Sequence, residues 1–445
     1  MTDTDKSIEH IWECIDKRKD RIIAIGEDIY KNPEVGFKEF RTSALVADEF
    51  RSLGLKPVEF DDIPGVKATV DTGRAGPAVA VIGELDAVIC RDHPECDRET
   101  GAVHACGHNI QIASMLGTAM GILDSGIMNE LTGKIHFMAV PAEEYIQIEQ
   151  RAALRERRTI RYLGGKPELL YRGWFDDIDI GILAHAAPGN KMFYMEPPNN
   201  GFIVKDIRYI GRAAHAGSAP GEGINALYAA NLGLMAVNSL RETFREEDCI
   251  RIHPIITKGG EIVNIIPDRV HMETYVRGRT MESVLEVNRK VDRALAGGAI
   301  ALGAKVEIED MPGFFPVIQN KNLQDIALHI MESLAGRDGI GYINGIGSTD
   351  MGDLSALMPV IQPLTGGVEG VLHSSSYRIK NKATAYLSGA KLMSGILKKL
   401  LANGACDAQK LLNEYVPVFS SRDMYFEYVD QLFSKKTYSA DCIEN

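Results

Sequence analysis

Residues 134–144 read KIHFMAVPAEE, an apolar run of strand length that ends in a proline, an alanine and two carboxylates. Two similar runs precede it, at 66–71 (VKATVD) and 78–83 (AVAVIG), and the small-residue pattern at 110–124 predicts a helix between the last two strands. Strands that alternate with helices predict a layered α/β domain. We therefore expect these runs to form the centre of a buried sheet.

The segments around this sheet are predicted to be mostly helical. Residues 6–54 predict two helices, the first ended by Asn32-Pro33 and the second by Gly54. Helices and short strands alternate again over 316–401. We expect one catalytic domain built from two parts of the chain, 1–199 and 314–403.

The segment between these parts has a different order of elements. The turn signal at 199–201 opens a pattern of strand 202–210, helix 222–242, strands 250–257 and 269–277, helix 281–298 and strand 304–309. This βαββαβ order is typical of ferredoxin-like domains. The sequence thus predicts an α/β fold with a mixed sheet and an inserted ferredoxin-like domain at 200–313. A C-terminal extension, 404–445, has no clear assignment.

Composition excludes several classes of protein. Of the 445 residues, 45% are hydrophobic and 25% are charged, which is ordinary for a globular protein and rules out a disordered or fibrous chain. The net charge of -12 argues against nucleic acid or an anionic membrane as a partner, because both need a basic surface. Seven scattered cysteines and a polar N-terminal stretch lead us to expect a cytoplasmic protein without a disulfide framework.

The densest group of reactive side chains is His104-Ala105-Cys106-Gly107-His108-Asn109. A thiolate and an imidazole on either side of a glycine can face one point at a turn between a strand and a helix. Cysteine and histidine are suitable ligands for Zn²⁺, and imidazole also suits Mn²⁺. A metal site and a loop with a buried cysteine and surface histidines both fit this motif when it is taken alone.

Carboxylates follow two of the predicted strands. Glu143 and Glu144 come after the strand at 134–140, and Glu84 and Asp86 come at the end of the strand at 78–83. Open α/β sheets bind ligands at the carboxyl ends of their strands. These side chains can therefore bind a metal, act as a general base or orient a ligating imidazole. A helix start and a strand-end turn are the alternatives.

Two isolated histidines complete the set of candidates. His185 follows the apolar run 179–184, and His373 lies in the glycine-rich stretch GGVEGVLHSSSY. One histidine of this kind is usually structural, but five candidate ligands from separate segments are harder to explain one by one.

These motifs resemble those of the M20 peptidase and amidohydrolase superfamily, and within it the M20D amidohydrolases, from residue 20 to residue 400. The matching stretches are NPEVGF at 32–37, ELDA at 84–87, HACGHN at 104–109, PAEE at 141–144, GRAAHAG at 211–217, GINA at 223–226, NIIP at 264–267 and STDMGD at 348–353. Asn109, ELDA and STDMGD resemble the subgroup that contains one of the two chains of p-aminobenzoyl-glutamate hydrolase and the β-alanyl-lysine dipeptidases.

The resemblance implies a role for each candidate. One or two divalent ions, Mn²⁺ or Zn²⁺, would be bound by Cys106, His108, Glu144, His185 and His373. Glu143 would be the general base that takes a proton from a metal-bound water and passes it to the leaving amine. Asp86 would act beside the ligands, as a catalytic residue that supports them.

The inserted domain resembles the lid and dimerisation domain of this family. His215 matches a histidine that reaches a partner's active site and stabilises the oxyanion, which makes a homodimer the expected assembly. Asn264 and Arg277 match a pair that binds the substrate carboxylate, a task that suits the bidentate geometry of arginine. A surface histidine and an ordinary ion pair are the alternatives.

Three features depart from the family pattern. Residues 89–103 are longer than a simple linker, and their C-x₂-H-x₂-C spacing lacks a fourth nearby ligand. The basic stretch 149–161 can either close on an acidic substrate or form a solvated helix face. Gln111 stands where many M20D members have a histidine, which leaves the metal stoichiometry open.

The sequence therefore predicts a metal-dependent amidohydrolase or dipeptidase with a small-molecule substrate. It would cleave the amide or peptide bond of N-acyl amino acids, aminobenzoyl-glutamate-like amides or dipeptides. Two alternatives stay open. One is a non-catalytic, metal-binding relative that binds small amides or serves as one half of a heteromer, and the other is a hydrolase of carbamoyl or ureido compounds.

Overall fold

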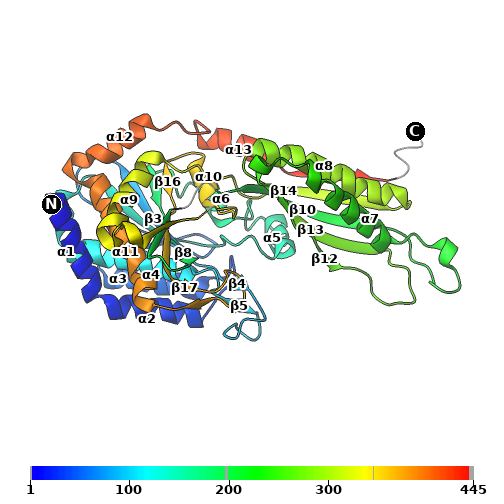
Figure 1. The fold of residues 1–445 in the computed structure, drawn as a ribbon, viewed down its shortest axis with the longest axis horizontal. Helices are drawn as coiled ribbons and strands as arrows, with labels where there is room; N and C mark the ends of the chain where they lie inside the picture. Colours follow the sequence, from blue (N-terminus) through cyan, green and yellow to red (C-terminus); the bar gives the residue numbers. More distant parts are fainter. Residues whose placement is uncertain (1–2, 196–198, 344, 440–445) are drawn as a thin grey trace. The chain divides into compact units, whose positions relative to one another are not determined.

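The computed structural model describes residues 3–195, 199–343 and 345–439. The chain divides into two compact units (Figure 1). The first unit comprises Met1–Pro197, Ile318–Gly345 and Asp353–Arg422, and the second comprises Pro198–Val317, Ile346–Gly352 and Asp423–Asn445. The second unit thus contains the predicted insertion together with two further segments that lie far from it in sequence.

A six-stranded mixed sheet forms the centre of the first unit. Its order is β1 (Val58–Glu59), β2 (Val66–Asp71), β6 (Lys134–Val140), β3 (Ala78–Glu84), β7 (Ile180–Ile182) and β16 (Val360–Ile361). The strands from β6 to β16 run parallel to one another, whereas β1 and β2 pair antiparallel with their neighbours. β3 is buried along its whole length, which explains its mostly apolar sequence. The combination of parallel and antiparallel strand pairs confirms the predicted mixed sheet.

Helix α4 (His108–Asp124) is buried along nearly its whole length among other helices. It packs against α11 (Lys382–Leu401), α1 (Asp3–Lys17) and α2 (Lys19–Lys31) (Figure 1). The small residues of α4 permit this close packing, since a Cβ atom at Gly121 would lie only 2.5 Å from Ile15. The prediction of two N-terminal helices was wrong, because a turn at Arg18 separates α1 from α2 and α3 (Phe40–Ser52) follows.

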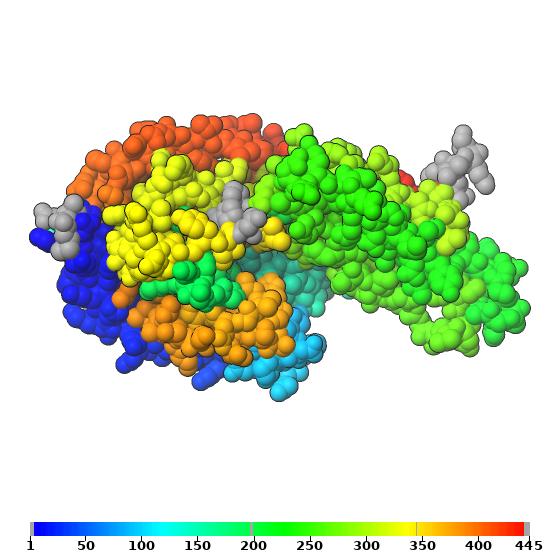
Figure 2. Space-filling view, in the orientation of Figure 1, coloured from blue at the N-terminus to red at the C-terminus, as the bar shows by residue number. Residues whose placement is uncertain are grey.

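Shorter elements complete the first unit. A second sheet contains β15 (Ile340–Tyr342), β9 (Phe193–Met195), β17 (Leu364–Glu369) and β18 (Arg378–Ile379), with β8 (His185–Pro188) beside β17. The segment 89–103 forms a hairpin of β4 (Val88–Ile89) and β5 (Ala102–Val103). The remaining helices are α5 (Ile148–Glu156), α6 (Gly165–Tyr171), α9 (Lys321–Ala335), α10 (Met351–Ser355) and α12 (Cys406–Glu414). α12, orange-red in Figure 2, lies at the surface.

The second unit is an antiparallel sheet covered on one face by two helices. The sheet has the order β11 (Arg251–Ile252), β13 (Arg269–Gly278), β10 (Gly201–Ile210), β14 (Lys305–Pro312) and β19 (Ser434–Tyr438), and β12 (Ile255–Lys258) also pairs with β13. Helices α7 (Ala226–Ser239) and α8 (Met281–Ala301) lie side by side on it (Figure 1). The predicted strand 250–257 is divided into β11 and β12 at Pro254, which cannot donate a backbone hydrogen bond.

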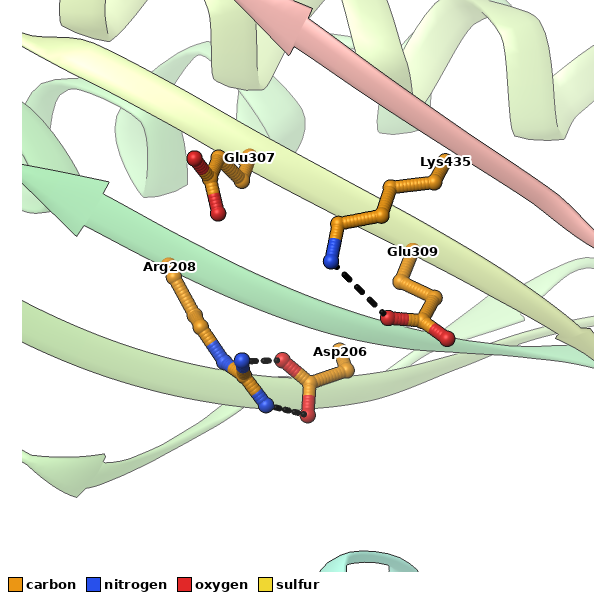
Figure 3. Close-up of a pocket in the computed structure, with 5 residues that line it drawn as sticks. All are labelled: Asp206, Arg208, Glu307, Glu309 and Lys435. Atoms are coloured by element: carbon orange, nitrogen blue, oxygen red, sulfur yellow. Dashed lines mark hydrogen bonds and ion pairs between the residues drawn. The ribbon is translucent and has the colours of Figure 1, made fainter. Parts of the chain in front are cut away.

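The open face of this sheet carries charged side chains in cross-strand rows. Around one small pocket, Arg208 lies 3.2 Å from Asp206, and Lys435 lies 3.8 Å from Glu309 (Figure 3). The Lys435–Glu309 pair joins neighbouring strands, whereas Asp206 and Arg208 lie two residues apart on β10. The pocket contains none of the residues that the sequence singles out as catalytic or ligating.

The C-terminal extension is divided between the units, with its residues up to Arg422 in the first unit and β19 in the sheet of the second. β19 pairs with β14 over five residues and covers that edge of the sheet, after α13 (Arg422–Asp430). Lys436 of β19 donates to Asp292 (2.8 Å), which also pairs with the buried Lys205. Two buried aspartates, Asp292 and Asp310, are thus balanced by two lysines. None of the described helices is both long and apolar enough to cross a membrane.

Candidate metal centre

The ends of adjacent parallel strands place the candidate carboxylates at one edge of the central sheet. β6, β3 and β7 are parallel neighbours, so their carboxyl ends meet at the same edge. Glu84 is the last residue of β3, and Glu143 and Glu144 follow β6 within four residues. His185 begins β8, shortly after β7 ends.

The start of helix α4 brings Cys106 and His108 to the same edge. Gly107 precedes the helix in the left-handed region, with φ +87°. A Cβ atom there would lie 2.8 Å from Ala186 and 2.9 Å from the Tyr377 hydroxyl oxygen. Both the left-handed backbone conformation and the close packing therefore require glycine at this position. This turn lets the side chains on either side of it face one region.

All five predicted ligands come together there. Two groups of side chains share the Cys106 thiol, and within each group the possible ligand atoms lie within 4.8 Å of one another. The first group is Cys106, His108 and His185, and the second is Cys106, Glu144 and His373. The Cys106 Sγ lies 3.4 Å from His185 Nε2, and His373 Nε2 lies 2.8 Å from Glu144 Oε1. Each group could hold a divalent ion, and Cys106 is common to both groups.

The buried polar atoms support this interpretation. His108 Nε2 has no hydrogen-bond partner among the described residues, although Glu84 Oε2 lies 3.1 Å from it. Unpaired buried polar atoms are costly unless something else satisfies them. The donor set of thiolate, imidazole and carboxylate is the one that Zn²⁺ uses, and imidazole and carboxylate also suit Mn²⁺. The residues therefore fit one or two divalent ions.

Asp86 orients both the imidazole and the loop that carries the two glutamates. His108 Nδ1 lies 2.8 Å from the Asp86 carbonyl oxygen and 3.2 Å from its carboxylate. With Nδ1 donating there, the lone pair of Nε2 is directed toward the ligand cluster. The Asp86 carboxylate also accepts the backbone N–H groups of Glu143 (3.2 Å) and Glu144 (2.9 Å).

The charges of the cluster stabilise one another in the metal-free protein. Burial and Glu144 raise the pKa of the Cys106 thiol, but the nearby histidines outweigh them and lower it to about 6. Glu144 raises the pKa of His373 to about 12. Burial lowers the pKa of His185, but Cys106 outweighs it and raises the value to about 9. The thiol is thus held as a thiolate, the form that binds metal.

The loop before the glutamate pair is strained and tightly held. Ala142, a non-glycine residue, has φ +56°. Its N–H donates to Glu39 Oε1 (2.8 Å), and its carbonyl accepts from Gly165 N–H (3.1 Å) and Arg151 Nη1 (3.3 Å). Arg151 is buried and also donates to the carbonyls of Leu163 (2.6 Å) and Glu144. The basic stretch 149–161 thus holds the loop before Glu143 through Arg151, a role that neither interpretation of its sequence included.

The C-x₂-H-x₂-C segment has no ligand cluster among the described residues. His93 Nε2 lies 2.9 Å from the Tyr377 carbonyl oxygen, and Cys96 Sγ donates to the Arg91 carbonyl oxygen. Neither residue belongs to a possible metal group in the part of the chain that the structure describes. His93 instead ties the 89–103 hairpin to the segment that follows His373.

The other three predicted residues lie in the second unit. His215 is exposed, and its Nδ1 accepts the backbone N–H groups of Gly217 (3.2 Å) and Ser218 (3.1 Å), which leaves Nε2 as the donor. The carbonyl of Asn264 accepts from the N–H of Ala216 next to it (3.0 Å). Arg277 lies over the rings of Phe202 and Tyr275, 5.2 Å from each centroid.

Sequence reasoning missed several residues that shape the centre. Lys166, Arg151 and Glu39 had no sequence signal, because each is a single charged residue in a polar or mixed segment. Gln111 was noted only for standing where relatives have a histidine. It donates to Glu84 Oε2 (2.8 Å), so a polar residue on the buried face of α4 was the available signal.

Comparison with known proteins agrees with this geometry. Residues 80–399 match the model of peptidase family M20/M25/M40. The chain is 28% identical to the Xaa-Arg dipeptidase of Mus musculus over 82% of its own length and 81% of the relative's. It is 25% identical to one chain of the p-aminobenzoyl-glutamate hydrolase of Escherichia coli over 63% and 71%.

A solved structure extends the likeness to the fold. The chain is similar to a dinuclear metal-binding peptidase of Bacillus subtilis, with a TM-score of 0.64, 20% identity, and coverage of 87% of this chain and 99% of that one. The chain belongs to peptidase family M20/M25/M40 and is a hydrolase.

Proposed function

We propose that the protein is a metal-dependent amidohydrolase that cleaves the amide or peptide bond of a small substrate with a free carboxylate. N-acyl amino acids, aminobenzoyl-glutamate-like amides and dipeptides are the substrate classes. The observation that carries the proposal is the convergence of two ligand groups on Cys106 beside the Glu143 carboxylate. The activities that name the two relatives, on dipeptides and on p-aminobenzoyl-glutamate, support the same classes.

Glu143 is suited to move the proton in this reaction. A bound divalent ion supplies Lewis acidity, which polarises the substrate carbonyl and lowers the pKa of a water. Glu143 Oε2 lies 3.8 Å from His108 Nε2, beside the ligands but in neither of the Cys106 groups. Its backbone is held by Asp86. Glu143 therefore takes the proton from the attacking water and returns it to the leaving amine.

The second unit supplies the proposed substrate contacts. His215 is exposed and its Nε2 carries the proton, so it can donate a hydrogen bond to a developing oxyanion. Arg277 and Asn264 are assigned to the substrate carboxylate. Arg277 lies over two adjacent aromatic rings, whose centroids are 5.0 Å apart, and this contact restrains its planar guanidinium, which favours bidentate binding. In this proposal, His215 acts on the active site of the partner in a homodimer.

An exposed apolar surface of the second unit supports the dimer. Tyr228, Leu232 and Met235 lie on one side of α7 at helical spacing, and Ile255 and Ile256 lie on the edge strand β12. A Cβ atom at Gly259 would lie 3.7 Å from both Ile256 and Leu227 of α7, so Ile256 lies near that helix, whereas Ile255 points to the opposite face of the strand. Contiguous apolar surface of this kind marks an interaction site.

Oligomeric state and activity test the dimer together. The variant Tyr228→Glu/Met235→Glu is expected to be a monomer by light scattering, to retain its metal and to lose turnover. Leu302→Glu, at another exposed apolar position of the second unit, serves as the control. A monomeric variant with full turnover would overturn the role of a partner's His215.

Turnover is tested by amine release from a panel of N-acetyl amino acids, aminobenzoyl-glutamate and dipeptides. Metal-stripped protein is reloaded with Mn²⁺ or Zn²⁺ and compared with Glu143→Gln, which keeps the ligands and removes the base. We expect release that requires metal and falls by roughly 10²–10⁴-fold in the variant. Normal turnover by Glu143→Gln would contradict the mechanism. Metal binding without release of any product would favour a non-catalytic, amide-binding role.

The proposed location is the cytoplasm. The six described cysteines, Cys14, Cys90, Cys96, Cys106, Cys249 and Cys406, are all free thiols, which suits a reducing compartment.

A further inference from the structure

Glu84 is a buried carboxylate to which the proposed reaction gives no role. It is fully buried at the end of β3, and its Oε1 accepts from the equally buried Lys166 Nζ (2.5 Å). Its Oε2 accepts from Gln111 Nε2 (2.8 Å), and its N–H donates to Gln111 Oε1 (3.2 Å). Burying the charges of Glu84 and Lys166 costs solvation free energy, which their ion pair offsets in part. Two partners from separate helices, α4 and α6, thus fix the direction of this carboxylate.

The fixed carboxylate faces a metal ligand without bonding to it. Glu84 Oε2 lies 3.1 Å from His108 Nε2, yet His108 Nε2 has no hydrogen-bond partner within the described ranges. His108 Nδ1 is already used by Asp86. Glu84 Oε2 and His108 Nε2 are therefore directed toward a common point and not at each other. Glu84 also forms a group of possible metal ligands with His108 and Glu143.

The distance agrees with shared coordination of one ion. Nitrogen and oxygen ligands bind Zn²⁺ at about 2.0–2.2 Å, so two of them at a tetrahedral angle lie about 3.4 Å apart. The 3.1 Å between Glu84 and His108 is close to this value. The 3.4 Å between Cys106 Sγ and His185 Nε2, in the group that also contains His108, is similar.

We propose that Glu84 is a further metal ligand, which completes the group of Cys106, His108 and His185 through its Oε2 atom. This inference rests on the proposed metal-dependent function and deepens it. One ion then has four protein ligands and a closed shell, as in structural zinc sites. The other group, Cys106, Glu144 and His373, has three and keeps a position for substrate or water. Lys166 neutralises the charge of Glu84 and holds its Oε1 away from the ion.

A crystal structure of the zinc-loaded protein, measured at the zinc absorption edge, tests the ligand directly. We expect Glu84 Oε2 within about 2.2 Å of one zinc ion. Zinc bound to the Cys106 groups with Glu84 Oε2 beyond about 3 Å would overturn this inference and leave the proposed function intact. Zinc in neither Cys106 group would overturn both.

Zinc titration of the metal-stripped protein provides a second test that does not depend on activity. For Glu84→Gln we expect one zinc equivalent to bind as in the wild type and the other to bind at least about tenfold more weakly. Glu84→His, which restores a ligating atom, is expected to recover part of that loss. Equal affinity of Glu84→Gln and wild type for both equivalents would overturn the inference.

Two further variants control for folding. Glu168→Gln alters another buried glutamate, which pairs with Arg172 and belongs to no metal group of the described chain, and it should leave both zinc equivalents unchanged. Glu84→Gln alone leaves the Lys166 ammonium buried opposite a neutral amide. The variant Glu84→Gln/Lys166→Met removes both charges and keeps the titration possible if the single variant does not fold.

Discussion

The two groups of candidate residues differ in how completely their surroundings fix them. In the first unit, each ligand of the metal centre is buried or held by a neighbour, as with His108 by Asp86. In the second unit, His215 is exposed and is fixed only by local backbone donors. The difference indicates that the candidate ligands are positioned by the core of one unit, whereas the position of His215 depends on its own loop.

Removing the shared ligand should have the largest effect. Cys106→Ala removes the atom common to both metal groups. We expect loss of both bound ions and of all turnover, measured by elemental analysis and amine release. Cys96→Ala, a buried cysteine outside the groups, is the control. One ion retained at full affinity by Cys106→Ala would show that the thiol does not bridge.

The strained loop provides the next test of preorganisation in the first unit. Arg151→Met removes the guanidinium donor from the carbonyls of Glu144 and Leu163 and leaves the Ala142 carbonyl with only the Gly165 N–H among the described residues. We expect the free energy of unfolding to fall by about 3 kcal/mol and kcat to fall with little change in KM. Arg157→Met, exposed at the end of α5, should change neither. A change in KM alone would instead indicate that Arg151 contacts the substrate.

Arg277 tests the assignment in the second unit. Arg277→Lys keeps the charge but loses the planar, bidentate group. We expect KM to rise about tenfold for substrates with a free carboxylate, because one strong hydrogen bond is lost. KM for the matching amides should stay unchanged. An equal rise for carboxylate and amide substrates would contradict the assignment.

A separate pH effect on stability should arise from His136 in the central sheet. Burial lowers the pKa of His136 on β6 to about 4, below its usual range near 6.5. The unfolded chain binds the proton first, so stability is lost as the pH falls from about 6.5 to about 4. Urea unfolding of wild type and His136→Gln across this window should show a smaller loss in the variant. Parallel curves would show that His136 does not titrate there.

The amino-acid sequence predicted the strands and ligands that short, continuous motifs encode. β3 and β6 are buried apolar runs, and the five ligands occur in short motifs that resemble a known family. Buried charge was not predictable in this way. Arg151 and Lys166 lie in polar segments that look solvated, and only the folded chain supplies the carbonyls and the carboxylate that make their burial tolerable. The strand SKKTY at the C-terminus was missed for the same reason, since Lys436 points at buried aspartates.

The position of β19 in the sheet affects the order in which the chain can fold during synthesis. Residues 434–438 are added long after β14, yet they form the strand next to it and supply Lys436 to Asp292 and Asp310. Until they emerge, these two aspartates have only Lys205 as a buried cation among the described residues. The second unit therefore completes its fold only after residues 434–438 have been added, whereas the strands around Glu84 and Glu143 are available much earlier.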